Sequence, residues 1–171
     1  MIDAALFSSV RTTPEGQGSS DCWTTPKSVL ERVRQVAPIG LDPCTTIDNP
    51  TGAHAFFDAE DDGLTRDWIC ARGKLVFCNP PYASMAEWSA KAIEQILKQK
   101  GELIFLCPAR TDTRWWHSML PHIDAVAFWR GRLRFGDATA SAPFPSAVLY
   151  AGERAKRFRA VFSDVAWVVE P

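Results

Sequence analysis

The sequence predicts an α/β fold, in which a mixed sheet is covered by helices on both faces. Short, nearly continuous apolar runs, typical of buried strands, alternate along the chain with segments of helical periodicity. The length of 171 residues and the hydrophobic content of 46% suit one domain with a substantial core. We therefore expect a polar N-terminal arm over residues 1–20, followed by a single domain over residues 21–171.

Three segments have the periodicity of amphipathic helices. The first is predicted over residues 26–36, where Thr25-Pro26 supplies a start and valines recur on one face. The second is predicted over residues 84–99, because apolar side chains again recur every three or four positions. A short third helix is predicted to run through Met119, with residues 110–113 as its N-terminal cap.

Apolar runs predict the strands. The clearest runs lie at residues 39–42, 74–78, 102–107, 125–129 and 147–150. Shorter runs, which would extend or close the sheet, lie at residues 55–57, 132–135, 161–162 and 165–169.

Three of the predicted strands end in loops that carry prolines and polar residues. These loops are Asp42-Pro43, Asn79-Pro80-Pro81-Tyr82 and Pro108-Ala109-Arg110. In open α/β sheets the sites lie at the carboxyl ends of the strands. We therefore expect the three loops to open onto one edge of the sheet and to form the site there.

The loop Asn79–Tyr82 carries the clearest chemical signal. Two successive prolines make it stiff, because they can neither extend a central strand nor enter a helix interior. The Asn79 side-chain oxygen and the Pro80 carbonyl are acceptors that could orient a planar amino group, and Tyr82 offers a ring face for stacking. A purely structural proline turn is the alternative interpretation.

Six segments together resemble a known family. They are Asp21–Pro26, Leu41–Cys44, Asp62–Leu64, Asn79–Tyr82, Arg110–Thr113 and Gly131–Phe135. In this order, with Asn-Pro-Pro-Tyr after an apolar strand, they are similar to the compact phage-type DNA N6-adenine methyltransferases, a Dam-like family. The resemblance covers residues 21 to about 150, which is most of the chain.

The resemblance implies a fold and an activity. The fold is an abbreviated Rossmann-like methyltransferase fold that binds S-adenosylmethionine. The activity is methyl transfer to the N6 amine of adenine in DNA, after the base is flipped out of the duplex. Asn79 and Pro80 would accept hydrogen bonds from the amine, and Tyr82 would stack on the base. A phage or prophage protein of this kind would act in the cytoplasm of a bacterial host.

The resemblance also implies which residues bind the cofactor. The N-terminal cofactor-contacting element is matched by Trp23, Thr25 and Pro26. The loop that holds the amino-acid part of S-adenosylmethionine is matched by Asp42 and Pro43. The acidic position near the adenosine is matched by Asp62.

Other interpretations of these residues stay open. Asp58, Glu60 or Asp61 could replace Asp62 as the acid that contacts the cofactor, and the whole cluster could be a solvated acidic turn. Asp42 could be only a turn acid. Trp23 could be only a hydrophobic contact on the first helix.

Two arginine-rich segments are expected to contact DNA. Arg110 and Arg114 lie beside a pair of tryptophans, which combines phosphate binding with a stacking surface. Arg132 and Arg134 are expected on one face of a hairpin. The alternatives are a capped helix whose tryptophans are core, and a solvated strand face. Since the net charge is -1, any contact with DNA must depend on such local clusters.

The cofactor loop departs from the family pattern. After Asp42 the chain reads Pro43-Cys44-Thr45-Thr46 instead of a glycine run, so side chains rather than a close backbone approach would hold the cofactor. Only about 36 residues separate Asp42 from Asn79, too few for the two complete strand–helix units of a standard methyltransferase, so we expect the sheet to be abbreviated between them. No separate target-recognition domain is evident. The rival hypotheses are methyl transfer to cytosine N4, to an RNA base or to a protein glutamine amide, and a catalytically inactive nucleic-acid-binding relative.

Other classes of protein are disfavoured. No run of about 18 apolar residues could cross a bilayer, and the first residues do not have the pattern of a secretory signal. The five cysteines are odd in number and widely spaced, which favours a reducing cytoplasm over a disulfide framework or a metal site.

Overall fold

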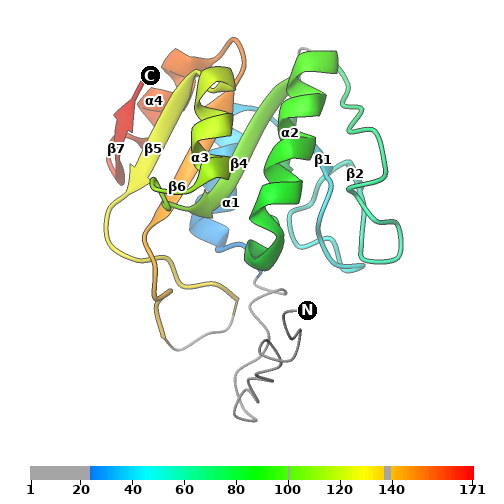
Figure 1. Ribbon diagram of the computed structural model, residues 1–171, viewed down its shortest axis with the longest axis horizontal. Helices are drawn as coiled ribbons and strands as arrows, with labels where there is room; N and C mark the ends of the chain where they lie inside the picture. Colours follow the sequence, from blue (N-terminus) through cyan, green and yellow to red (C-terminus); the bar gives the residue numbers. More distant parts are fainter. Residues whose placement is uncertain (1–23, 100, 137–139) are drawn as a thin grey trace, which may run out of the picture.

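Helices and strands alternate in the structure, as the sequence predicts (Figure 1). It is a computed structural model, and it describes residues 24–99, 101–136 and 140–171. The predicted arm over residues 1–20 lies outside the described residues. Among the described helices, none is long and apolar enough to cross a membrane.

A seven-stranded mixed sheet forms the centre of the molecule, with the order β2-β1-β3-β4-β6-β5-β7. Its strands are β1 (Ile39–Asp42), β2 (Ala55–Phe56), β3 (Leu75–Cys78), β4 (Glu102–Pro108), β5 (Ala125–Trp129), β6 (Ser146–Ala151) and β7 (Ala166–Val169). Neighbours among β2, β1, β3 and β4 pair in parallel, whereas β6 is antiparallel to both β4 and β5. The carboxyl ends of β1 to β5 therefore meet at one edge of the sheet.

Helices cover both faces of this sheet, as predicted (Figure 1). The helices α1 (Lys27–Val36) and α4 (Ala155–Phe162) pack on one face. The helices α2 (Met85–Gln99) and α3 (Arg114–Met119) pack on the other. Alternate strand residues enter two separate cores: Phe77 joins the core under α1 and α4, and Cys78 joins the core under α2 and α3.

The long predicted elements are confirmed to within one or two residues. The helix α1 buries Val29, Val33 and Val36 against the sheet, and Pro38 follows its C-cap residue, Ala37. The strand β3 is buried along its whole length because helices cover both of its faces. No helix or strand lies in residues 57–74 between β2 and β3, in line with the predicted shortening of the sheet.

The prediction of a strand over residues 132–135 is wrong. Leu133 and Phe135 are buried while Arg132 and Arg134 are exposed, so burial alternates as it would in a strand, but the segment pairs with no strand. It is a loop that the Ala142 N–H fastens by donating to the Leu133 carbonyl. The alternation imitated a strand without the ladder of hydrogen bonds that defines one.

The prediction of a strand over residues 161–162 is also wrong, because both residues belong to α4. This helix was not predicted from the sequence. The signal was Phe158 and Phe162, which lie four positions apart on one helix face and whose ring centroids are 4.5 Å apart.

The predicted cap of α3 is only partly correct. Thr113 occupies the N-cap position, but its side chain makes no capping hydrogen bond. Its hydroxyl instead donates to the Arg110 carbonyl at 2.8 Å. The segment 110–113 is therefore a turn that leads into the helix.

Candidate active site

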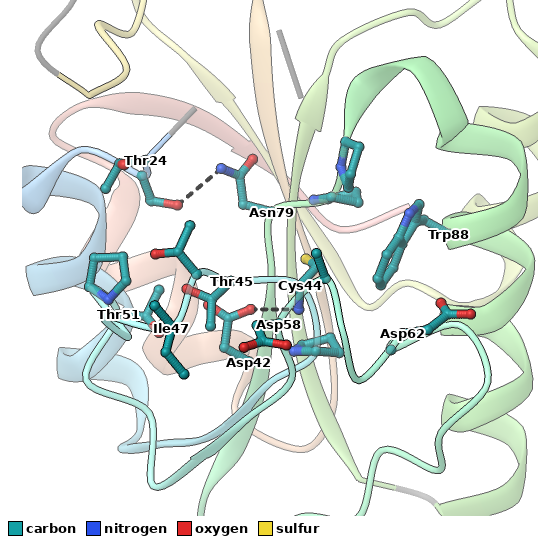
Figure 2. Close-up of a pocket in the computed structure, with 18 of the residues that line it drawn as sticks. Thr24, Asp42, Cys44, Thr45, Ile47, Thr51, Asp58, Asp62, Asn79 and Trp88 are labelled. Atoms are coloured by element: carbon teal, nitrogen blue, oxygen red, sulfur yellow. Dashed lines mark hydrogen bonds between the residues drawn. The ribbon is translucent and has the colours of Figure 1, made fainter. Parts of the chain in front are cut away.

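A cavity of about 460 Å³ opens at the carboxyl edge of the sheet, where the sequence predicted a site. Its walls come from the segment before α1 and from the loops after β1, β2 and β3. Thr25 lines it. So do Asp42, Asp58, Asn79 and Trp88, which are labelled in Figure 2. Segments far apart in the sequence thus meet around one space.

The side-chain amide of Asn79 is held at both ends. Asn79 follows the last residue of β3, and its Nδ2 donates to Thr25 Oγ1 at 3.1 Å, a bond marked in Figure 2. The Tyr82 hydroxyl donates to Asn79 Oδ1 at 3.0 Å. The buried Pro80 stiffens the backbone between them. The amide therefore has a defined orientation at the wall of the cavity.

The ring of Tyr82 is fixed by two aromatic neighbours. Phe135 and Phe144 meet it at interplanar angles of 86° and 75°, with ring centroids 6.0 and 5.3 Å away. Such edge-to-face contacts are favourable for aromatic rings. Burial raises the pKa of Tyr82 well above its ordinary value, so its hydroxyl stays neutral and can donate to Asn79.

The carboxylate of Asp42 is buried at the end of β1, with 2% of the residue exposed. Its Oδ1 accepts the Cys44 backbone N–H at 3.1 Å (Figure 2). Desolvation by burial raises the pKa of Asp42 to about 6, although hydrogen bonds from the following loop act in the opposite direction. Asp42 is thus ionised at neutral pH in an environment that disfavours its charge.

Two cysteines connect the loop after β1 to the end of β3. The sulfur atoms of Cys44 and Cys78 are 3.5 Å apart. Burial raises the pKa of each thiol, so both stay protonated at neutral pH. They act here as a packing contact between the loop after β1 and the end of β3.

The acidic turn contributes three of its four acids to the cavity. Asp58, Glu60 and Asp62 line it. Asp61 does not, because it turns toward Arg66, with the closest charged atoms 3.8 Å apart. Asp58 follows β2 closely, and the Phe57 N–H donates to the Asp42 carbonyl. Asp62 lies toward Trp88, whose ring is close to Gly63 (Figure 2).

Gly63 allows the acidic turn to pack against the loop after β1. A Cβ atom at this position would lie 1.9 Å from the Pro43 carbonyl oxygen and 3.2 Å from the Trp88 ring. The Gly63 carbonyl also accepts the Trp68 indole N–H at 2.8 Å. Only glycine allows the two loops to approach this closely.

The four arginines predicted to contact DNA are exposed and follow the carboxyl ends of β4 and β5, at the same edge as the cavity. They are Arg110, Arg114, Arg132 and Arg134. None of them forms an ion pair or a side-chain hydrogen bond with a residue that the structure describes. Seven other arginines do have such partners, namely Arg32, Arg34, Arg66, Arg130, Arg154, Arg157 and Arg159. The expectation of a hairpin face for Arg132 and Arg134 is wrong, because they lie on a loop.

The structure brings most of the predicted residues together. Around the cavity lie Thr25, Asp42, Pro43, Asp62, Asn79, Pro80, Pro81 and Tyr82. Pro26 instead starts α1 as its N-cap residue and does not line the cavity, and Trp23 lies outside the described residues. The described residues contain no cluster of three or more His, Cys, Asp or Glu side chains that could hold a metal ion.

Thr51 and Trp88 are among the contributors to the cavity that the sequence did not reveal. The helical spacing of Trp88 marked it as core, and its ring does stack on Trp68 at a centroid distance of 6.0 Å. It lies near the start of α2, so the same ring also reaches the cavity. Thr51 had no signal in its loop beyond its polarity.

The chain is similar to known proteins of one kind. Residues 12–152 match the family described as DNA N-6-adenine-methyltransferase (Dam). A DNA N-6-adenine-methyltransferase of Haemophilus phage HP1 is 28% identical over 114 residues, which cover 66% of this chain and 64% of the phage protein. One of Escherichia phage T1 is 30% identical over 96 residues, covering 56% of this chain but only 39% of the relative. Because the family match extends over most of the chain, the chain belongs to the DNA N-6-adenine-methyltransferase (Dam) family.

Proposed function

We propose that this chain transfers the methyl group of S-adenosylmethionine to the N6 amine of adenine in DNA. The observation that carries the proposal is the orientation of Asn79. Its amide is held between Thr25 and Tyr82 at the wall of a cavity that the acids after β1 and β2 also line. The two phage relatives bear the name of this activity.

The residues around the cavity fit S-adenosylmethionine. A volume of about 460 Å³ lies in the range of small-molecule sites, which is roughly 300–1,000 Å³. The ribose hydroxyls suit Asp58, since an acid after the second strand of a parallel pair binds ribose in open α/β sheets. Asp42 and the loop that it holds suit the charged amino-acid part. Asp62, on the Trp88 side of the cavity, is the alternative partner of the adenosine.

The fit does not need a glycine run after β1. The backbone turns at Pro43, and the loop is held by the hydrogen bond from Cys44 to Asp42. Side chains such as Thr45 and Thr51 face the cavity instead of bare backbone. In this proposal the cofactor is bound mainly by side chains, as the loop sequence suggests.

The catalytic loop would make the target amine a better nucleophile. The nitrogen lone pair of an adenine amine is delocalised into its ring. Acceptors at Asn79 Oδ1 and at the Pro80 carbonyl would hold the two N–H groups so that the lone pair leaves the ring plane and faces the cavity. When bound, S-adenosylmethionine supplies a sulfonium methyl group that is open to in-line displacement. Tyr82 would stack on the flipped base.

The exposed arginines would bind the phosphates of DNA around the cavity. An arginine that already has an ion-pair partner gains little free energy by binding phosphate instead. These four arginines have no ion-pair partner among the described residues, and they lie at the same edge of the sheet as the cavity. Their local positive charge would offset the net charge of -1. A duplex base would be flipped into the cavity between them.

The test is methyl transfer from radiolabelled S-adenosylmethionine to unmethylated duplex DNA, followed by nucleoside analysis. Wild type should produce N6-methyladenine, and N79A should lose it. Q35A, which removes an exposed amide from α1 away from the cavity, is the matched control. Label on cytosine, RNA or protein would refute adenine as the target. No transfer and no heat of cofactor binding would refute the enzyme and favour an inactive nucleic-acid-binding relative.

A further inference from the structure

Thr25 has a buried hydroxyl group that the adjacent helix does not use. Only 7% of the residue is exposed, and it directly precedes the N-cap residue of α1, Pro26. The backbone carbonyl of Pro26 accepts the N–H groups of Val29 and Leu30, and no side chain caps this helix end. A threonine before a helix often serves as such a cap. Here its hydroxyl accepts the Asn79 side chain instead.

The position of Thr25 is fixed from two sides. On one side, Pro26 starts α1, which is packed on the sheet through its valines. On the other side, the Thr24 carbonyl accepts the Gly136 N–H at 2.8 Å. Gly136 has a positive φ of 55°, a conformation that glycine adopts without strain. The hydroxyl that meets Asn79 is therefore held by fixed backbone.

We propose that Thr25 is a positioning residue, which orients the Asn79 amide for methyl transfer rather than binding the cofactor. The inference rests on the proposed function of Asn79. An asparagine side chain presents an acceptor at one end and donors at the other, and rotation about its last bond exchanges them. The target amine needs the acceptor. By accepting Nδ2, Thr25 keeps Oδ1 as the atom available to the amine.

The hydrogen bonds to Thr25 and to Tyr82 act differently on the Asn79 amide. The Tyr82 hydroxyl donates to Oδ1, which marks that atom as the acceptor end of the amide, and an amide oxygen has two lone pairs. Donation from Nδ2 to Thr25 polarises the amide and makes Oδ1 a stronger acceptor, since linked hydrogen bonds reinforce one another. Loss of the Thr25 hydroxyl would therefore reduce the stabilisation of the transition state more than it reduces the binding of either substrate.

The kinetic test compares three variants of the full chain. T25V keeps the shape but removes the hydroxyl, T25S keeps the hydroxyl, and S28A removes an exposed hydroxyl from the first turn of α1 as a matched control. We expect single-turnover transfer to fall roughly tenfold in T25V, the effect of one lost or misaligned hydrogen bond. T25S should retain transfer near the wild-type rate. Calorimetry should give the same S-adenosylmethionine affinity for T25V and wild type.

A second readout does not depend on activity. The chain has two asparagines, Asn49 and Asn79, so selective ¹⁵N labelling of asparagine gives two pairs of side-chain NH₂ signals. The Asn49 amide donates to the Ala53 carbonyl at 3.0 Å, away from Thr25, and serves as the internal reference. T25V should shift only the Asn79 pair and speed the solvent exchange of its protons. T25S should leave both pairs close to their wild-type positions.

Each outcome decides the inference. If T25V weakens cofactor binding while transfer at saturating cofactor is unchanged, Thr25 is a cofactor contact and the inference is wrong. The same holds if neither the rate nor the Asn79 signals change. If wild type transfers no methyl group, the proposed function fails, whereas the NMR comparison still reports whether Thr25 holds the amide. Should T25V fail to fold, T25A carries the same comparisons against T25S.

Discussion

The carboxyl group of Asp42 should lower the stability of the fold at neutral pH, and D42N tests this. Burial raises the pKa of Asp42 from 3.8 to about 6, so its ionisation is less favourable in the folded protein than in the unfolded chain. One pKa unit corresponds to about 1.4 kcal/mol. At a pH where the group is charged in both states, its ionisation therefore lowers the free energy of unfolding by about 3 kcal/mol.

The direction of the pH dependence follows from the raised pKa. Below pH 3.8 the group is protonated in both states and costs nothing, and between pH 3.8 and about 6 the folded state binds more protons than the unfolded chain. Its contribution to stability therefore falls as pH rises through this window, opposite to the usual case of a carboxylate with a lowered pKa. D42N lacks this titration. Relative to wild type, it should gain about 1 kcal/mol between pH 5 and pH 8.

Urea unfolding followed by circular dichroism at pH 5 and pH 8 measures this difference. An amide oxygen at position 42 can still accept the Cys44 N–H, so the loop should keep its shape. D48N is the matched control, because Asp48 is an exposed acid in the same loop. A stability difference between D42N and wild type that stays the same at both pH values would refute the burial argument.

Three further changes probe other parts of the site. G63A should lose about 1–3 kcal/mol of stability and bind S-adenosylmethionine more weakly, because the new Cβ would overlap the Pro43 carbonyl. Thermal unfolding and calorimetry measure the two effects, and the control is G101A, where a Cβ would have no neighbour within 4 Å. R114A should weaken DNA binding and reduce the slope of log affinity against log salt by about 1, measured by fluorescence anisotropy, whereas R159A, already ion-paired, should not. If Asp58 binds the ribose, D58N should weaken cofactor binding by about tenfold or more, and D62N should weaken it by less, as measured by calorimetry. The reverse order of the two effects would assign the ribose to Asp62.

The sequence predicted those helices and strands whose buried apolar residues repeat at a regular spacing. Both long helices and the central strands were found because their apolar residues repeat at the spacing of the structure they form. The segment 132–135 failed for the same reason, since inward Leu133 and Phe135 alternate with outward arginines in a loop. Period alone does not reveal whether a partner strand is present.

The sequence predicted those residues of the candidate site that lie at the ends of strands. Asp42 and Asn79 follow strands that are parallel in the sheet, so the topology alone brings them to one edge. The roles of neighbouring groups required coordinates. Neither the bond between Thr25 and Asn79 nor the rotation of Asp61 toward Arg66 follows from spacing, because both depend on where loops fold back.

The cost at Asp42 itself supports a functional role for this carboxylate. The acids Asp48 and Glu60 of the same region are exposed to solvent, whereas Asp42 is charged at neutral pH under desolvation that its hydrogen bonds only partly offset. A role confined to holding the turn would be served by Asn, which can accept the same Cys44 N–H without an ionisation cost. The negative charge of Asp42 would attract the ammonium group of a bound amino acid. The free-energy cost of ionising Asp42 would then be offset only in the complex. The stability gained in D42N at pH 8 should therefore be accompanied by weaker S-adenosylmethionine binding. Equal cofactor affinity in D42N and wild type would leave the charge of Asp42 without this purpose.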